Sequence, residues 1–129
     1  MNDNTTEPRG TLAIRTLAMP ADTNPNGDIF GGWLMSQMDI AGGITAHSRA
    51  DGRVVTVGVE AMTFHLPVKV GDVVCCYADI LKTGTTSISV LIQVWVLQDR
   101  NPASRVMVTE GTFTYVAIDE IGNKRSVPT

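Results

Sequence analysis

The sequence of 129 residues predicts an α+β fold, in which five strands form a mostly antiparallel sheet against one long helix. Apolar residues recur three or four positions apart between Gly31 and Ala50, which is the period of an amphipathic helix. After Asp51 the period changes to two and stays so as far as Ala117, as in half-buried strands. The connections between these strands are too short for parallel crossovers, so the strands are expected to run antiparallel.

One strand and one loop precede the helix. Residues 11–19 mix apolar and polar side chains and predict a strand, whereas Met1–Gly10 is polar and is expected to form a tail. The segment Pro20–Gly27 is dense in residues that set turn dihedrals, so we expect a loop there.

The predicted helix, Gly31–Ala50, combines an apolar face with two costly glycines. Leu34, Met38 and Ala41 fall on one face. Gly42 and Gly43 each cost a helix about 1 kcal/mol relative to Ala. A helix that carries this cost is expected to have another group close against its backbone.

Four strands follow, with turns rich in Gly, Asp or Pro between them. Their expected positions are residues 53–64, 73–81, a long strand within 83–98, and 105–117. One face of the second strand of the chain is expected to carry Val55, Val57, Val59 and Ala61. The long strand is expected to have one wholly apolar face, formed by Ile88, Val90, Ile92, Val94 and Val96.

Some apolar residues are expected to point away from the helix, because their positions have the opposite parity to the residues assigned to the helix side: Leu91, Trp95, Leu97, Phe113 and Tyr115. One helix covers one face of a sheet, so these groups need a second surface. We therefore expect self-association, with edge strands pairing between copies, and at least a dimer.

Composition excludes several classes of function. With 10 Lys+Arg against 13 Asp+Glu, the chain lacks the basic excess of a nucleic-acid platform. No stretch of about 18 apolar residues predicts a membrane span, and the first residues do not resemble a signal peptide. Cys75 and Cys76 are adjacent, which is poor geometry for a disulfide. A reduced, cytoplasmic protein is the expectation.

Asp39 is the first candidate for chemistry. It is the only acid in an otherwise uncharged stretch from Ile29 to Ser48. Small and apolar neighbours one turn away suit a general base or a nucleophile in a cleft. The alternative is a surface acid on the solvated side of the helix.

A second candidate is the glycine pair Gly31 and Gly32, directly before the predicted helix. Free backbone N–H groups at a helix start can hold an oxyanion or a polarised carbonyl. The alternative is a tight turn that simply needs glycine. The glycine spacing and the absence of the required Lys exclude a phosphate-binding loop of the nucleotide-binding type.

Other reactive side chains suggest no site by themselves. His47 and His65 have no Cys, His or Asp at ligand spacing, so no metal site is predicted. Neither cysteine has a nearby His, and no Gly-x-Ser-x-Gly elbow exists. The basic side chains near strand ends are either solvated charges or a phosphate-holding rim: Lys82, Arg100, Arg105, Lys124 and Arg125.

The pattern Asn24-x-x-Gly27-x-x-x-Gly31-Gly32, followed by Asp39 on the helix, resembles the hotdog-fold acyl-coenzyme A (CoA) thioesterases. The resemblance is strongest to their short bacterial single-domain (YciA-type) branch. Five stretches extend it from Gly10 to Pro128: Arg15–Pro20, Phe30–Trp33, Arg53–Thr56, Val70–Val74 and Phe113–Val116. It implies one hotdog domain over residues 1–129, with polar tails at 1–10 and 120–129 and the sheet wrapped around the helix.

The resemblance also implies an activity and its residues. The activity would be hydrolysis of fatty acyl-CoA to free acid and CoA, without metal or other cofactor. Asp39 would be the general base or nucleophile, and the backbone N–H of Gly32 would polarise the thioester carbonyl. Asn24 of the partner subunit would position the thioester or the water, at the interface of a dimer that commonly forms a trimer of dimers.

Substrate-binding positions are implied in the same way. Phe30 and Gly31 would contact the substrate, and Phe30, where some relatives carry His, receives no acid–base role. The CoA moiety would lie along Thr83, Gly84, Thr85 and Ser87, with Arg125 near its phosphates. Two other functions stay open: a hotdog hydratase or dehydratase, which normally pairs a His with an acid, and a non-catalytic acyl-CoA-binding oligomer.

Overall fold

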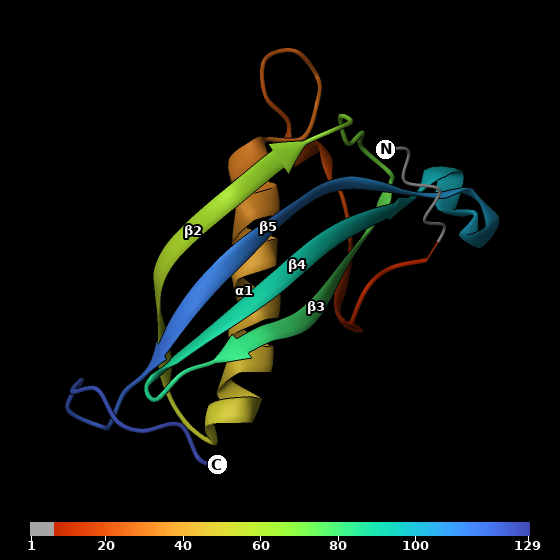
Figure 1. Ribbon diagram of the computed structural model, residues 1–129. Helices are drawn as coiled ribbons and strands as arrows, with labels where there is room; N and C mark the ends of the chain where they lie inside the picture. Colours follow the sequence, from red (N-terminus) through yellow and green to blue (C-terminus); the bar gives the residue numbers. More distant parts are fainter. Residues whose placement is uncertain (1–6) are drawn as a thin grey trace.

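A computed structural model describes residues 7–129, and residues 1–6 of the expected N-terminal tail lie outside the described part of the chain. Six main elements follow one another (Figure 1): β1 (Thr11–Leu17), α1 (Gly31–Ala50), β2 (Val54–Phe64), β3 (Val73–Thr83), β4 (Ser87–Leu97) and β5 (Arg105–Ala117). Three short 3₁₀ turns lie in the loops: η1 (Pro20–Asp22), η2 (Gln98–Arg100) and η3 (Pro102–Ser104). No helix among residues 7–129 is long and apolar enough to cross a bilayer.

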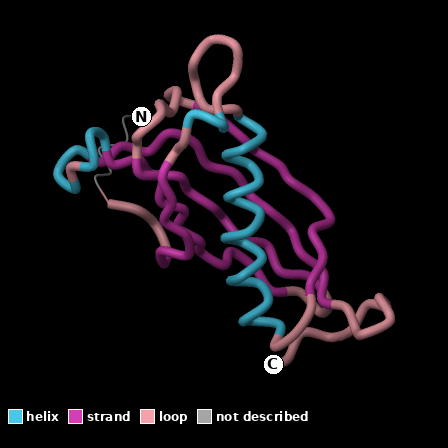
Figure 2. The backbone as a smooth tube through the Cα atoms, turned by 180° about the vertical axis from the view of Figure 1, so that it is seen from behind, coloured by secondary structure: helices cyan, strands magenta, loops and turns pink. Residues whose placement is uncertain are grey.

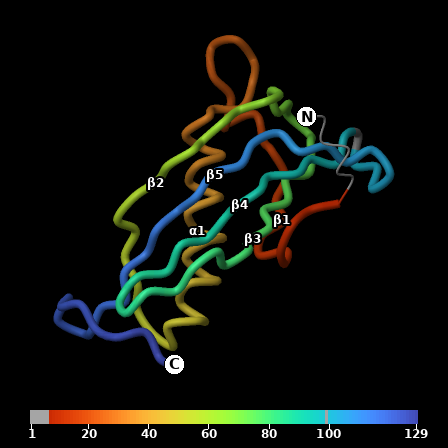
Figure 3. Tube along the Cα trace, viewed as in Figure 1, coloured from red at the N-terminus to blue at the C-terminus, as the bar shows by residue number. Residues whose placement is uncertain are grey.

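The five strands form one antiparallel sheet in the order β1-β3-β4-β5-β2 (Figure 3). The helix α1 runs along one face of it (Figure 2). This confirms the predicted α+β architecture, with β1 and β2 as the two edges. The first strand ends at Leu17, two residues before the predicted end, and β3 continues to Thr83.

The helix α1 has the predicted bounds, and its predicted apolar face is buried. Leu34, Met38 and Ala41 lie in the core. The helix ends at Asp51, whose left-handed backbone (φ +53°) turns the chain away, and the N–H of Asp51 donates to the carbonyl of His47. The period in the sequence therefore located this element correctly.

The apolar face of β4 is confirmed, because Ile88, Val90, Ile92, Val94 and Val96 are all buried in the core. The prediction for β5 was partly wrong. Tyr115 pairs with Ile88 and Phe113 pairs with Val90, so both aromatic side chains lie on the helix side of the sheet. Residues opposite each other in an antiparallel pair share a face, and that register overrides the parity assumed from the sequence.

The expected single apolar face of β2 was also wrong. Val55 pairs with Val116 and Val59 pairs with Phe113, which places these two valines on opposite faces of the sheet. Irregularities between Thr56 and Gly58 and between Glu60 and Thr63 interrupt the alternation, as β-bulges do. The second one contains Ala61, whose φ is +57°.

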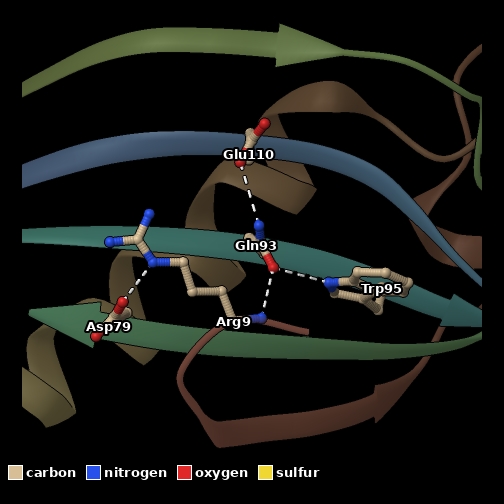
Figure 4. Close-up of polar contacts among 5 residues, drawn as sticks. All are labelled: Arg9, Asp79, Gln93, Trp95 and Glu110. Carbon is tan, nitrogen blue, oxygen red and sulfur yellow. Dashed lines mark hydrogen bonds and ion pairs between the residues drawn. The ribbon is translucent and has the colours of Figure 1, made fainter. Parts of the chain in front are cut away.

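The outer face of the sheet, away from α1, carries a polar network that includes Trp95 (Figure 4). The Oε1 atom of Gln93 accepts the Arg9 N–H at 2.8 Å and the Trp95 Nε1–H at 3.0 Å, and its amide nitrogen donates to Glu110 at 3.3 Å. Arg9 pairs with Asp79 at 2.6 Å. Trp95 is only 3% exposed, so its burial does not require a second copy of the chain. Exposed apolar side chains of the sheet lie on both edge strands, with Leu12 and Leu17 on β1 and Val55, Val57, Val59 and Phe64 on β2, and Leu81 on β3 is exposed as well.

The C-terminal segment, expected as a polar tail, folds back onto the body. Ile118 and Lys124 form an isolated antiparallel bridge, and Val127 is buried. The N–H of Val127 donates to the carbonyl of Thr85 at 2.7 Å. Local polarity did not indicate this contact, which places the C-terminus beside the β3–β4 turn.

Candidate active site

The carboxylate of Asp39 is the centre of the candidate site. It lies in the third turn of α1, on the side that faces β2 and β5. The Thr56 hydroxyl donates to its Oδ1 at 2.7 Å, and the Tyr115 hydroxyl lies 3.0 Å from the same oxygen. Asp39 is half-buried and held by two side chains, so it is not a freely solvated surface acid.

Tyr115 reaches Asp39 from the sheet beneath the helix. Its side chain is 1% exposed, and its hydroxyl is 3.0 Å from both the backbone oxygen and Oδ1 of Asp39. Burial raises the pKa of Tyr115 well above its ordinary value, and the charge of Asp39 and their hydrogen bond raise the same pKa further. The phenol therefore keeps its proton and acts as a donor.

Gly42 makes this approach possible. A Cβ at position 42 would overlap the Tyr115 hydroxyl and lie 2.8 Å from Ile92 Cδ1. At Gly43 the corresponding atom would only meet Tyr115 Cε2 at 3.9 Å, an ordinary contact. The expectation that a group lies close against the helix backbone is thus confirmed at Gly42.

Sequence reasoning missed Thr56 and Tyr115 as parts of the site. Thr56 pairs with Tyr115 across β2 and β5, and this pairing brings both hydroxyls to the helix side. The signal in the sequence was that Thr56, a hydroxyl residue between Val55 and Val57, points to the opposite face from these two valines in a regular strand.

The start of α1 offers an open backbone donor at Gly32. Trp33 and Leu34 donate their N–H groups to the carbonyl of Phe30, whereas no hydrogen bond within residues 7–129 uses the Gly32 N–H. Apart from its chain neighbours and the adjacent helix backbone, nothing among the described residues would lie within 4 Å of a Cβ at position 32. Gly32 precedes Asp39 by two helical turns, about 10 Å along the same side of the helix.

The loop before α1 lies beside the N-terminal end of that helix (Figure 1), and Asn24 belongs to this loop. Its side-chain oxygen accepts the N–H groups of Asn26 at 2.9 Å and Asp28 at 3.1 Å. No hydrogen bond among the described residues uses its amide nitrogen, and none joins Asn24 to Asp39. One chain alone therefore does not bring these two predicted site residues into contact.

The β3–β4 turn lies at the other end of α1, beside the C-terminus (Figure 1). Gly84 donates its N–H to the Ser87 carbonyl at 2.7 Å. A surface pocket here is lined by Thr83, Gly84, Thr85 and the last four residues, with Arg49 beside them. Within one chain this predicted CoA-binding turn is thus remote from the start of α1.

Arg125 ties the end of α1 to the C-terminal segment. Its guanidinium donates to the carbonyl of Ala50 at 2.9 Å and to that of Ile118 at 3.0 Å. These bonds satisfy a carbonyl that a helix end leaves without an intrahelical partner. The predicted Arg125 is not among the residues that line the pocket; Arg49, which the sequence did not single out, lines it and donates to the Pro128 carbonyl at 2.6 Å.

Within residues 7–129 the titratable side chains form no other candidate centre. No group of three or more His, Cys, Asp or Glu in residues 7–129 is arranged to hold a metal ion. Neither His47 nor His65 hydrogen-bonds to Asp39 within the described part of the chain. Cys75 and Cys76 are buried free thiols, and burial, with the charge of Cys75, raises the pKa of Cys76 to about 12.

Comparison with known proteins identifies the family. The profile of the thioesterase superfamily matches residues 26–103, which is more than half of the chain. The chain belongs to the thioesterase superfamily. Its sheet around a single long helix is the hotdog fold.

Thioesterases similar to this chain include curated and solved examples. The acyl-CoA thioester hydrolase YciA of Salmonella typhimurium is 62% identical over 128 residues, covering 98% of this chain and 95% of that protein. A hexameric thioesterase of Yersinia pestis is 60% identical with a TM-score of 0.90, covering 95% and 99% of the two chains.

An acyl-CoA hydrolase of Staphylococcus aureus, solved with butyryl-CoA and CoA, is 31% identical with a TM-score of 0.82, covering 89% and 70%. Variants of that thioesterase with an asparagine, an aspartate or a threonine replaced by alanine have also been solved. The three replaced residues are spaced along that chain as Asn24, Asp39 and Thr56 are spaced here.

Proposed function

We propose that this thioesterase hydrolyses fatty acyl-CoA thioesters to free acid and CoA, with Asp39 as the reacting carboxylate. The observation that carries the proposal is the pair of hydroxyl donors, Thr56 and Tyr115, that hold a half-buried carboxylate on the helix. Sequence identity of 62% to an acyl-CoA thioester hydrolase supports the substrate class.

The reaction needs a carboxylate, a water molecule and an oxyanion donor. In one route Asp39 takes a proton from water, the water oxygen attacks the thioester carbon, the C–S bond breaks and the CoA thiolate takes up a proton. In the other route Asp39 attacks directly, CoA leaves, and water then cleaves the mixed anhydride. Both routes develop negative charge on the carbonyl oxygen, which the Gly32 N–H would stabilise. General-base assistance typically contributes about 10²–10⁴-fold.

We further propose that the active site is shared between two copies in a homodimer, which assembles as a trimer of dimers. Asn24 of the partner subunit would position the thioester or the water beside Asp39. The exposed edge strand β2, with Val57 58% exposed, supports pairing between copies. The hexameric Yersinia pestis relative supports the larger assembly.

The substrate contacts belong to the same proposal. Phe30 and Gly31 would contact the thioester end, and the CoA moiety would lie along the β3–β4 turn and Ser87, the first residue of β4. Arg125 would approach the CoA phosphates only with the donors that its three bonds to backbone carbonyls leave available. The pocket at this turn is lined by Arg49, a second cation suited to phosphate.

No cofactor enters this chemistry, and we propose a cytoplasmic location. The two routes require only water and protein groups. Two buried free thiols, Cys75 and Cys76, fit a reducing compartment. Cell fractionation with an antibody to the native protein tests the location.

Thiol release from acyl-CoAs of increasing length, from acetyl to palmitoyl, tests the proposed function. A hydrolase produces free CoA thiol and gives the chain-length range in the same experiment. Binding of CoA without release from any substrate would indicate the non-catalytic binding oligomer. Loss of enoyl-CoA absorbance without thiol release would indicate a hydratase.

A further inference from the structure

Asp39 is held through one of its two carboxylate oxygens. Thr56 and Tyr115 both approach Oδ1, at 2.7 and 3.0 Å. No hydrogen bond within residues 7–129 uses Oδ2. A carboxylate with one oxygen fixed by two donors presents the other oxygen, with its lone pairs, in a defined direction.

The Tyr115 hydroxyl has one proton and two acceptors at the same distance, the backbone oxygen and Oδ1 of Asp39. The carboxylate is the charged acceptor, and hydrogen bonds to charged groups are the stronger ones. The hydroxyl thus links the carboxylate to the helix backbone of the same residue and restricts the side-chain rotation of Asp39.

We propose that Tyr115 is a positioning residue for the reaction: with Thr56 it fixes Oδ1 of Asp39, so that Oδ2 is the oxygen that meets the water or the thioester carbon. The proposal rests on the proposed function of Asp39. Gly42 belongs to the same arrangement, because a side chain there would displace the Tyr115 hydroxyl.

Two properties of Tyr115 suit this role. It is buried, so core packing holds its ring and hydroxyl in place. Its pKa is raised by burial and by the neighbouring carboxylate, so it donates a proton and does not add a second negative charge. A tyrosine that only filled the core would not need a glycine in the helix opposite its hydroxyl.

The test compares Tyr115→Phe with Tyr77→Phe in the full-length oligomer. The chain has two tyrosines, and Tyr77 lies on β3 without contact to Asp39, so the second substitution is a matched control. We expect Tyr115→Phe to lower kcat by about 10- to 100-fold with KM changed less than about 3-fold, because the lost bond is to a charged group that acts in the transition state. Tyr77→Phe should leave both constants unchanged.

A mutant cycle separates positioning from a structural role. In the Asp39→Asn background, Tyr115→Phe should change the residual turnover less than about 2-fold, because the residue acts through the carboxylate. An equal loss in both backgrounds, or a Tyr115→Phe enzyme with wild-type kcat, would overturn the proposal. Wild-type turnover in Asp39→Asn alone would instead refute the proposed function.

A second measurement covers the case in which Tyr115→Phe does not fold. With Tyr77→Phe in place, biosynthetic 3-fluorotyrosine labels Tyr115 alone, and its ¹⁹F resonance reports the hydroxyl contact. The resonance should shift on Asp39→Asn and on Thr56→Val. A resonance that is the same with and without the Asp39 carboxylate would contradict the contact on which the proposal depends.

Discussion

Two neighbouring glycines in α1 make a matched pair for a stability prediction. Gly42→Ala places a Cβ over the Tyr115 hydroxyl, 2.8 Å from Ile92 Cδ1 and 3.0 Å from Tyr115 Cε1. Gly43→Ala adds the same methyl group where only Tyr115 Cε2 lies near, at 3.9 Å. Both substitutions gain about 1 kcal/mol of helix propensity, so the difference between them isolates the packing at Tyr115.

The expected cost of Gly42→Ala follows from three contributions. Overpacking a well-filled core costs about 1–3 kcal/mol. Displacing the Tyr115 hydroxyl from a charged acceptor costs about 1.5–3 kcal/mol, and helix propensity returns about 1. We therefore expect a net loss of about 1.5–5 kcal/mol in the free energy of unfolding for Gly42→Ala, and a gain of up to about 1 kcal/mol for Gly43→Ala.

Urea unfolding at one fixed protein concentration measures both variants against wild type, since the stability of an oligomer depends on concentration. Adding Tyr115→Phe to Gly42→Ala removes the overlapped oxygen and should recover part of the loss. A Gly42→Ala protein as stable as Gly43→Ala would refute the close approach of Tyr115 to the helix backbone.

Three further predictions follow from other parts of the structure. Mixing Asp39→Asn and Asn24→Ala subunits through unfolding and reassembly should restore about a quarter of wild-type turnover. Half of the random dimers are mixed, and each mixed dimer has one intact site out of two. No recovery would place both residues of a site in one chain. Arg125→Ala should lower the free energy of unfolding by about 1–3 kcal/mol through loss of the hydrogen bonds to the Ala50 and Ile118 carbonyls. Arg125→Lys should recover little of this loss. Urea midpoints equal to that of wild type would contradict a stabilising role for Arg125. The pKa of Cys76 is raised in the folded protein to about 12 from 9.0. The contribution of the protonated thiol to stability is therefore fully present below about pH 9 and is lost as the pH rises towards 12. The free energy of unfolding, measured against pH, should fall over this range in wild type and fall less in Cys76→Ala.

Sequence periodicity located the main elements because each of them buries one face. The helix Gly31–Ala50 and the apolar face of β4 have strong, regular patterns, and both agree with the structure. The costly Gly42 correctly indicated a close contact, although the sequence did not show that Tyr115 makes it.

The remaining features depend on register, which local patterns do not determine. Phe113 and Tyr115 were assigned to the wrong face because the β4–β5 pairing shifts register between Val94 and Trp95, and this irregularity reverses the parity of β5 beyond it. The irregularity after Thr56 changes the faces of the valines in β2. Thr56 becomes part of the candidate site only through its pairing with Tyr115, a contact between residues far apart in the sequence.

Turnover by Asp39→Asn compared with wild type tests the central claim most directly. Asparagine keeps the shape of the side chain and its ability to accept from Thr56 and Tyr115, but it neither takes a proton from water nor attacks a thioester. Thiol release from the preferred acyl-CoA should fall at least about 10²-fold in kcat with a modest change in KM. Near-wild-type turnover by a correctly assembled Asp39→Asn protein would contradict the assignment of Asp39 as the reacting carboxylate.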